Sequence, residues 1–525
     1  MAIIISSVNA RIGASAEEIF QKALSKAGIR AKAECHIHKT SLDARKHDNI
    51  HYVHSVYAEL HNESLELKLA DKKPFVTRVE NGGYVPAISD KKVSGRVVIA
   101  GFGPSGMFAG LALAEQGYRP LILERGQRVD ERVKAVECFM SGGELDESSN
   151  IQFGEGGAGT FSDGKLTTRI KDPLCRYVSE QLVRFGAPEE ILTKAKAHIG
   201  TDKLRLVVKA LRERIEELGG EIRFDTKLTD IELSDGRVTK VAFEGGECEC
   251  SALLLAIGHS ARDTFELLAS KGIFLEAKPF SVGARIEHLQ TSVDESLYGE
   301  HAGDPMLPKG EYQLSWRNTE GRGVYTFCMC PGGYVVPAAS ERGGVVTNGM
   351  SEFARDGKNA NAAVVVGVSP ADFGSGVLSG VDFARQIEQR AYKLTGSYKA
   401  CGTTVKGFLE GRPSLDTAIV PSYSLGLIPV EYRELFPSFV TSMLERGLAE
   451  FSRKMQCFGD GSALLTAPET RTSSPVRITR TDKLCSLSAE NLYPSGEGAG
   501  YAGGIMSAAV DGLRCALKLM ETQAP

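Results

Sequence analysis

Residues 96–126 contain the feature that most constrains the fold, an apolar run followed directly by a glycine-rich turn. The β-branched run 97–100 predicts a buried parallel strand. A Gly-x-Gly-x-x-Gly spacing follows, and the Ala- and Leu-rich stretch up to Gln116 predicts a helix. A second apolar strand is predicted at 120–123 and ends at Glu124. Strand, glycine turn, helix, strand and terminal acid in this order are typical of a dinucleotide-binding unit.

Each glycine of this turn has its own physical task. Gly101 permits the tight turn, Gly103 lets the backbone approach a pyrophosphate, and Gly106 lets the helix pack closely on the strand. The free N–H groups and the positive dipole end of the helix then attract the phosphates. Glu124 lies where an acid accepts hydrogen bonds from the adenosine ribose. The predicted phosphate contacts are Gly101, Gly103, Pro104, Ser105 and Gly106.

The composition limits the class of protein. A chain of 525 residues has enough material for about two to four domains. A net charge of −4 gives no electrostatic signature of binding to nucleic acid or to an anionic membrane. The eleven cysteines are scattered and contain no Cys-x-x-Cys pair, which predicts reduced thiols and a cytoplasmic protein. No stretch approaches the roughly 20 apolar residues of a membrane span, and the first residues predict a strand, not a signal peptide.

Residues 1–92 predict a separate small α/β domain. Its predicted elements are a strand at 3–6, a helix at 16–26 and strands at 33–40 and 49–59. His36 and His38 have the spacing of two residues on one face of a strand, which metal ligands also use. No acid or cysteine cluster lies near them, which favours a polar strand face. The turn at 81–83 and the charged run 90–92 predict a linker.

A second concentration of glycines lies at 141–166. A glycine-rich stretch of this length inside a compact domain is usually either functional or disordered. Its interspersed aromatic and charged residues favour an ordered loop packed on a ligand. Glycines let the backbone approach a flat ring closely. The predicted cofactor contacts here are Gly156, Gly157, Ala158, Gly159 and Thr160.

The chain then predicts helices at 173–185 and 204–218, the second capped by Thr201 and Asp202. Asp235-Gly236 predicts a hairpin turn. The run 252–256 predicts another buried strand, which is followed by a glycine and small residues. This order suits a sheet that crosses beneath a bound dinucleotide, so Ala256 and Gly258 are predicted contacts.

A third glycine loop, at 496–504, opens a predicted helix near the end of the chain. Two helix-opening glycine loops, one near each end, favour one long ligand, and FAD has that form. The second loop would then place an acid on the ribityl chain and a helix N-terminus at the flavin ring. A second strand–glycine–helix–acid unit is absent, so NAD(P)H as a transient electron donor would bind without its own Rossmann domain. The predicted contacts of this loop are Gly496, Glu497, Gly503, Gly504 and Ile505.

The region 280–460 differs in character, with alternating strand patterns and many Gly and Pro turns. Its predicted elements include strands at 325–329, 334–337 and 344–347 and a helix at 381–392. We therefore predict an α/β fold: a Rossmann-type FAD-binding domain with an inserted mixed α+β substrate domain and a small N-terminal α/β domain. The predicted domains are 1–92, 93–279, 280–460 and 461–525, the second and fourth forming the FAD-binding domain.

Six stretches carry a resemblance to a known family. They are 101–126, 153–166 (Phe-Gly-Glu-Gly-Gly-Ala-Gly-Thr-Phe-Ser-Asp-Gly-Lys-Leu), 198–204, 327–333, 469–478 and 496–505. Together they resemble a bacterial family of poorly characterised FAD-dependent dehydrogenases, also described as NAD(FAD)-utilising dehydrogenases, over most of the chain. More distantly they resemble the glutathione-reductase superfamily. The resemblance implies FAD and the ligands Gly101, Gly103, Ser105, Gly106, Glu124, Arg125, Gly496 and Glu497, although Asp is usual in the superfamily where this chain has Glu497.

Three side chains are candidates for the chemistry, since a flavin enzyme needs a positioned substrate and one managed proton. Lys165 follows the second glycine loop, whereas Arg285 and His288 open the inserted region. An ordinary salt bridge or a satisfied core polar group is the alternative for each. Cys328 and Cys330 would share one side of a regular strand, and two buried thiols are favoured over a redox pair.

The sequence therefore predicts an FAD oxidoreductase that moves hydride between a small organic molecule and the flavin. A flavin monooxygenase is an alternative, because Asp163-Gly164 resembles a motif of that class. A flavin-bearing protein whose N-terminal domain docks RNA or protein is a third reading. The small excess of basic residues in 1–92 disfavours nucleic acid as the partner. No membrane partner and no metal are predicted, and the oligomeric state is left open.

Overall fold

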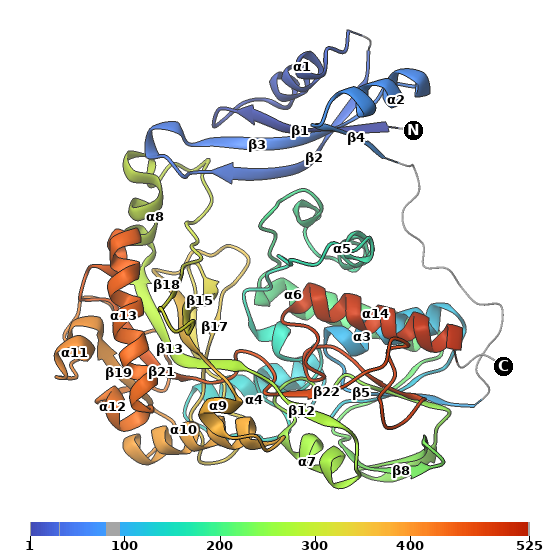
Figure 1. The fold of residues 1–525 in the computed structure, drawn as a ribbon, viewed down its shortest axis with the longest axis vertical. Coiled ribbons are helices and arrows are strands. Elements are labelled where there is room, and N and C mark those ends of the chain that lie inside the picture. The colour runs from blue at the N-terminus through green and yellow to red at the C-terminus, as the bar shows by residue number, and fades with distance from the viewer. Residues whose placement is uncertain (1, 31, 80–94, 523–525) are drawn as a thin grey trace.

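The computed structural model describes residues 2–30, 32–79 and 95–522. Sheets of four, five and seven strands organise the described part of the chain. The predicted turn at 81–83 and the charged run 90–92 lie outside these described residues. Figure 1 shows the four-stranded sheet apart from the rest, above the two larger sheets.

The N-terminal region is a four-stranded antiparallel sheet in the order β2-β3-β1-β4 with two helices. Its elements are β1 Ala2–Ala10, α1 Ala16–Ala27, β2 Glu34–Asp43, β3 His51–Glu59, α2 Glu63–Lys72 and β4 Val76–Val79. Helix α1 begins with a capping box, in which Ser15 and Glu18 bond each other's backbone N–H groups. The predicted α/β character is confirmed. His36 and His38 do not follow a regular strand, because the pairing register of β2 shifts at His38.

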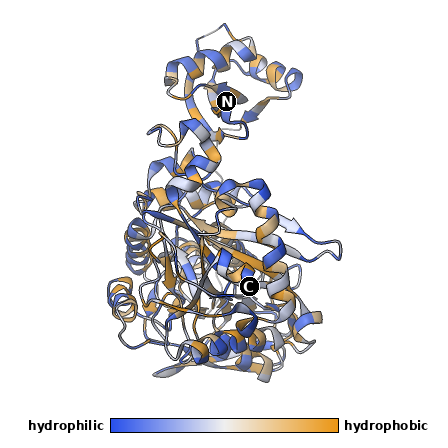
Figure 2. Ribbon diagram, turned by 90° about the vertical axis from the view of Figure 1, so that its left-hand side faces the viewer, coloured by the Kyte–Doolittle hydropathy of each residue, from blue (hydrophilic) through white to orange (hydrophobic). Residues whose placement is uncertain are grey.

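The N-terminal region contacts the rest of the chain through main-chain hydrogen bonds at Thr40. Its N–H donates to Thr193 O over 2.7 Å, and its carbonyl accepts from Ala195 N over 2.8 Å. Tyr52 Oη also donates to Met306 O over 2.7 Å. Figure 2 shows this region as a lobe of its own on the larger body.

The five-stranded sheet is parallel, in the order β23-β11-β5-β6-β7. Its strands are β5 Val97–Ala100, β6 Leu121–Leu123, β7 Glu221–Arg223, β11 Ala252–Leu255 and β23 Leu492–Pro494. Alternate residues of β5 enter different cores: Val97 and Ile99 face the helices, whereas Val98 and Ala100 face the opposite side. The predicted buried strands at 97–100 and 252–256 are therefore confirmed, and so is the Rossmann-type arrangement.

Helices cover one face of this sheet, and a small antiparallel sheet together with helix α7 covers the other. The helices of this part are α3 Pro104–Glu115, α4 Val129–Met140, α5 Leu174–Arg184, α6 Thr201–Glu217, α7 Arg262–Ser270 and α14 Ile505–Thr522; the small sheet is β8 Leu228–Ser234, β9 Arg237–Phe243 and β10 Gly246–Glu249. Helices α3 and α14 touch so closely that a Cβ on Gly512 would lie 2.0 Å from Ser105 O. The predicted hairpin turn at Asp235-Gly236 is confirmed. The predicted cap of α6 is wrong by a residue or two, because Thr201 and Asp202 already lie inside the helix.

The seven-stranded sheet has the order β14-β15-β18-β13-β21-β19-β20 and is mostly antiparallel. Helices α10 and α13 pack on one of its faces. The strands are β13 Phe280–Leu289, β14 Ser315–Arg317, β15 Gly323–Cys330, β18 Asn359–Val368, β19 Ala400–Thr404, β20 Leu427–Pro429 and β21 Leu464–Glu469; the helices of this part are α8 Gln290–Tyr298, α9 Pro370–Phe373, α10 Ser379–Thr395, α11 Val405–Glu410, α12 Tyr432–Leu435 and α13 Ser438–Lys454. Two small pairs complete the set: β12 Leu275–Ala277 with β22 Val476–Ile478, and β16 Tyr334–Pro337 with β17 Thr347–Met350.

Two predicted limits differ from the structure. The strand expected at 344–347 begins only at Thr347. The predicted end of the inserted region, at residue 460, lies before β21, yet β21 pairs with β13 and β19 and so belongs to the seven-stranded sheet. The division into four domains stays a proposal, and we propose to move this limit beyond β21.

Candidate cofactor and substrate cavity

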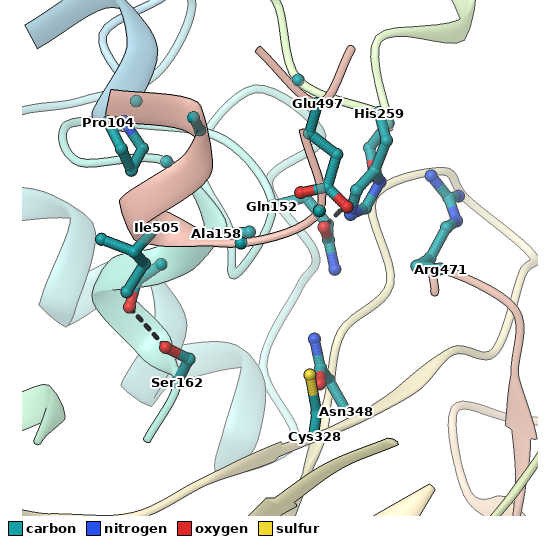
Figure 3. A pocket seen from close by; sticks show the side chains of 18 of the residues that line it. Pro104, Gln152, Ala158, Ser162, His259, Cys328, Asn348, Arg471, Glu497 and Ile505 are labelled. Carbon is teal, nitrogen blue, oxygen red and sulfur yellow. Dashed lines mark hydrogen bonds between the residues drawn. The ribbon is translucent and has the colours of Figure 1, made fainter. Parts of the chain in front are cut away.

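A cavity of about 490 Å³ lies between the carboxyl ends of the parallel strands and the seven-stranded sheet. Ala100, Leu123 and Ala256, at the ends of β5, β6 and β11, line one side. Residues 326–330 of β15 and Glu469 of β21 line the other. Figure 3 shows side chains of both parts around the same space. The carboxyl edge of a parallel sheet is the usual ligand site of such folds, and this cavity has the size of a small-molecule site.

The first glycine loop has no space for side chains. A Cβ on Gly101 would lie 2.3 Å from Ala256 O, and one on Gly106 would lie 2.0 Å from Gly101 O. The N-terminus of α3 opens into the cavity, since Gly103, Pro104 and Ser105 line it. Free N–H groups and a positive dipole end therefore face the ligand space, as predicted for an anion site.

Glu124 follows β6 and joins three backbone segments. Its Oε2 accepts from Phe102 N over 2.8 Å, and its Oε1 accepts from Gly126 N and Gly154 N, each over 3.0 Å. The side chain is buried and also lines the cavity. Glu124 thus holds both glycine loops in place at the position predicted for a ribose ligand.

The second glycine loop is organised by Arg132 of α4, a residue that the sequence reasoning missed. Its fully buried guanidinium donates five hydrogen bonds to main-chain carbonyls. The acceptors are Asn150, Ile151, Gly154, Glu155 and Gly157, at distances of 2.7 to 3.2 Å. A loop without regular structure is thereby ordered, since its carbonyl groups are satisfied by one side chain. An Arg in an amphipathic helix carries no sequence signal for this role.

The third glycine loop ends at the N-terminus of α14. Gly496 packs on α3, because a Cβ there would lie 2.8 Å from Ser105 Cβ, and its N–H donates to Asp511 Oδ2 over 2.7 Å. Glu497 faces the cavity, and burial raises its pKa to about 7, although the charge of Lys278 opposes the shift. The N-termini of α3 and α14 therefore open into one space.

The structure brings most of the predicted cofactor contacts to this cavity. The predicted contacts that line it are Gly101, Gly103, Pro104, Ser105, Glu124, Arg125, Gly157, Ala158, Gly159, Ala256, Gly258, Glu497, Gly503, Gly504 and Ile505. Gly106, Gly156, Thr160 and Gly496 lie behind this wall, where they permit close packing and do not face the ligand space. The role of each as a cofactor contact stays a prediction.

The three candidates for the chemistry separate in the structure. Lys165 lines the cavity, and its Nζ lies 3.2 Å from Glu311 Oε2. Arg285 and His288 are fully buried and are not part of the cavity wall, so neither is in a position to touch a ligand there. His288 packs against the rings of Tyr312 and Phe458, and burial lowers its pKa to about 4. We correct the assignment of these two side chains accordingly.

Arg285 instead lies behind the cavity wall and binds the residues that form its floor, which are Cys328, Asn348 and Glu469. It forms an ion pair with Glu469 at 2.8 and 3.0 Å, and it donates to Cys328 O over 2.7 Å and to Asn348 Oδ1 over 2.8 Å. Cys328 has a φ of +42°, and the register of β15 slips between Phe327 and Cys330. Cys328 and Cys330 therefore do not share one side of a regular strand. Both are free thiols, but only Cys330 is buried, because Cys328 is exposed on the cavity wall, so the expectation of two buried thiols is wrong for Cys328.

Ionic clusters occur at two places on the wall. Lys165 and Lys196 both contact Glu311, at 3.2 and 3.0 Å, and although burial alone would raise the pKa of Glu311, these charges lower it to about 2. On another side Arg471 donates to Glu388 Oε1 over 3.0 Å. Burial, and then the charges of Arg471 and Arg262, lower the pKa of the neighbouring His259 to about 3, so its imidazole is neutral.

Two comparisons with known proteins bear on this cavity. Residues 279–472, which include all strands of the seven-stranded sheet, match a family model described as FAD-dependent protein, C-terminal domain-like. An uncharacterized protein of Clostridium beijerinckii is 44% identical to the chain over 528 aligned positions, which span 99% of both proteins. The chain belongs to the same family as this protein. FAD is the cofactor of the present chain.

The solved structures that resemble this chain have low sequence identity to it and low TM-scores. A mutant of the halogenase PltM in complex with FAD covers 82% of this chain and 70% of its own, at 12% identity and a TM-score of 0.39. Glycine oxidase from Bacillus cereus covers 82% of this chain and 98% of its own, at 11% identity and a TM-score of 0.35. A geranylgeranyl bacteriochlorophyll reductase-like protein from Thermoplasma acidophilum covers 81% and 78%, at 14% identity and a TM-score of 0.35. Nothing about the reaction follows from similarities this low.

The residues of the cavity fit FAD. Gly101 lets the loop turn close against Ala256, since even a methyl group would collide there, and Gly103 at the start of α3 lines the cavity without a side chain that could block a pyrophosphate. Two helix N-termini open into the cavity, where they would favour the negative charges of FAD, and Glu124 is an oxygen acceptor beside the first loop. Across the described residues, no helix is long and apolar enough to cross a membrane. The same part of the chain holds no group of three or more His, Cys, Asp or Glu placed to bind a metal.

Proposed function

We propose that this protein is an FAD-dependent oxidoreductase that transfers hydride between a small organic molecule and flavin N5. We propose further that it is a member of the bacterial FAD-dependent dehydrogenase family and, through it, of the glutathione-reductase-like superfamily. FAD supplies the centre that accepts or donates the hydride. The observation that carries the proposal is that one cavity runs from the loop at Gly101 to Cys328 and Asn348 on the seven-stranded sheet. A second molecule can therefore lie between the sheet and the cofactor.

The chain contributes positioning and electrostatics to this reaction. The amino-terminal end of α14, at Gly503 to Ile505, presents its positive dipole end to the cavity, which favours negative charge on a bound ring system. Lys165 adds an ammonium group on the same wall. We keep Lys165 as the candidate that balances negative charge during the reaction. Lys196 also contacts the carboxylate of Glu311, so substitution of Lys196 is a control for substitution of Lys165.

The monooxygenase alternative rests on the dipeptide Asp163-Gly164. In the structure Asp163 Oδ1 accepts from Arg355 Nε over 2.9 Å, and Ser351 Oγ also donates to Asp163. These bonds join the second glycine loop to the segment after β17. The acid thereby has a structural task that explains its presence without a monooxygenase motif.

Purified protein tests the proposal in two steps. Bound FAD gives an absorption band near 450 nm, on the order of the wavelength of oxidised flavin. This band is then followed without oxygen during addition of NADH, NADPH or a panel of small alcohols, amines and hydroxy acids. Bleaching by one class of donor supports the oxidoreductase. Absence of flavin overturns it, and NAD(P)H oxidation that yields a hydroxylated product favours the monooxygenase.

A further inference from the structure

Two carboxamide side chains from different parts of the fold face each other across the cavity. Gln152 belongs to the second glycine loop, and Asn348 belongs to β17. Both line the cavity, and Figure 3 shows their amide nitrogens pointing toward one another with open space between them. A carboxamide presents either an acceptor oxygen or two N–H donors, so its orientation decides what it binds.

The orientation of Asn348 is determined by what binds its oxygen. Oδ1 accepts from Arg285 Nη2 and from Gly349 N, each over 2.8 Å. Because Arg285 is always charged and is anchored by Glu469, the oxygen of Asn348 must face it. The Nδ2 group then points into the cavity. Within the described residues it has no hydrogen-bond acceptor.

The orientation of Gln152 follows from a chain of hydrogen bonds. Ser260 Oγ donates to Gln152 Oε1 over 3.2 Å and lies 2.9 Å from His259 Nδ1. The Ser260 hydroxyl has one proton, so His259 must be the donor in its bond to Ser260. The neutral state of His259 agrees with this tautomer. Gln152 is 94% buried, and its Nε2 reaches one protein acceptor, Ala338 O, only at 3.5 Å.

The surroundings favour an acceptor that carries negative charge. Arg471 lines the cavity and donates to Glu388 through Nε and Nη2, whereas its Nη1 has no hydrogen-bond partner among the described residues. Arg262, which binds the same carboxylate of Glu388, is also paired with Glu341. Glu469 is balanced by Arg285. Glu497 also faces the cavity, but its pKa of about 7 leaves it only partly ionised at neutral pH. A carboxylate oxygen is therefore a better match here than a neutral carbonyl.

We propose that Gln152 and Asn348 form a two-donor cradle that binds a carboxylate of the molecule held on the sheet side of the flavin. This inference names a substrate class and so rests on the proposed function, but the binding step does not require turnover. Arg285 is a positioning residue, since it acts through Asn348. The one other source of a matching acceptor is a carbonyl oxygen of the flavin itself.

A matched set of probes tests the ligand class. The flavin-loaded protein is titrated with benzoate, benzamide, benzyl alcohol and benzylamine, and two signals are followed: the flavin difference spectrum and the Tm. Benzoate is expected to bind most tightly, benzamide more weakly, and benzylamine not at all. Equal responses to benzoate and benzylamine, or no saturable response to benzoate and benzamide, would overturn the proposal.

Near-isosteric variants then locate the site. Asn348→Asp and Gln152→Glu each replace a donor by a carboxylate oxygen, and each is expected to weaken benzoate binding at least tenfold with FAD retained. Gln181→Glu, in α5 and away from the cavity, is the control and should leave benzoate binding unchanged. Loss of FAD or a changed flavin spectrum without any change in benzoate affinity assigns the cradle to the flavin carbonyl, and overturns the proposal. If a neutral donor reduces the flavin in all variants while benzoate binding does not depend on Gln152 or Asn348, the oxidoreductase proposal stands and the carboxylate cradle is wrong.

Discussion

Glu388 of α10 and Arg262 of α7 form a two-pronged ion pair, with N–O distances of 2.8 and 2.9 Å. Arg471, which follows β21, binds the same carboxylate at 3.0 and 3.2 Å, and Thr470 Oγ1 donates to it over 2.6 Å. The pair links the helix that follows β11 to the seven-stranded sheet region. It therefore holds together the two parts of the chain that enclose the cavity.

Glu388→Gln should destabilise the protein by about 3–5 kcal/mol, because buried Arg471 loses its carboxylate partner and buried Arg262 keeps only Glu341. The measurement is the free energy of unfolding from urea titration. Glu266→Gln is the control, since Glu266 is a half-exposed partner of Arg385. A loss for Glu388→Gln no larger than that of the control would contradict the structural role.

The same carboxylate predicts a dependence of stability on pH. Burial alone would raise the pKa of Glu388, but the charges of Arg262 and Arg471 lower it to about 2. Its pKa in the folded protein is thus below the ordinary value of 4.5, so its stabilisation is fully present above about pH 4.5 and is lost as the pH falls toward 2. Unfolding free energies at several pH values should fall more steeply with acid in the unaltered protein than in Glu388→Gln. Parallel curves would show that Glu388 does not contribute.

Glu124→Gln should weaken FAD binding and lower the Tm. The carboxylate accepts from three backbone N–H groups with both of its oxygens, and an amide would turn an N–H₂ group toward at least one of these donors. An unsatisfied buried donor costs about 1–3 kcal/mol. FAD retained after gel filtration and the Tm of the loaded protein are the readouts. Full retention with an unchanged Tm would argue against this role.

Gly106→Ala should yield protein without FAD or with much less of it. The added methyl would lie 2.0 Å from Gly101 O, so α3 or the loop must shift by an amount that costs about 1–3 kcal/mol. Gly323→Ala is a matched control, because a Cβ there finds its nearest atom at 3.9 Å. Flavin content per mole of protein decides the outcome, and equal content in both variants would be inconsistent with the predicted close packing.

Arg285→Met should destabilise the protein and leave the side chain of Asn348 free to turn. Glu469 would lose its cation and Asn348 Oδ1 would lose its donor, at a cost of about 3–5 kcal/mol. Arg285→Lys keeps the charge but lacks the planar fork, so it should recover part of the stability while benzoate affinity stays low. A Lys variant that restores both equally would show that charge alone, and not orientation of Asn348, is what matters.

Local sequence patterns predicted the cofactor half of the cavity. The strand at 97–100, its glycine turn and the helix behind it depend on contacts within about 30 residues, which is why the pattern of glycines and apolar residues is sufficient. The close approaches at Gly101 and Gly106 follow directly from that pattern.

The floor of the cavity was not predicted, because its side chains come from distant segments. The sequence offers Arg285 and His288 as candidates on one strand, yet only the pairing of β13 with β18 and β21 decides that both are buried behind the cavity wall. Gln152 and Asn348 lie 196 positions apart in the sequence, and no local periodicity connects them. Cys328 lies at a β-bulge with a positive φ, which the sequence pattern does not predict.

By itself, then, the sequence determined where a dinucleotide is held, since backbone geometry at glycines and helix ends is a local property. The tertiary structure decided which side chains face the space beyond the cofactor. Hydrogen bonds between segments far apart in the chain, from Arg285 to Asn348 and from Ser260 to Gln152, orient those side chains, and such bonds exist only once distant strands and loops have packed together.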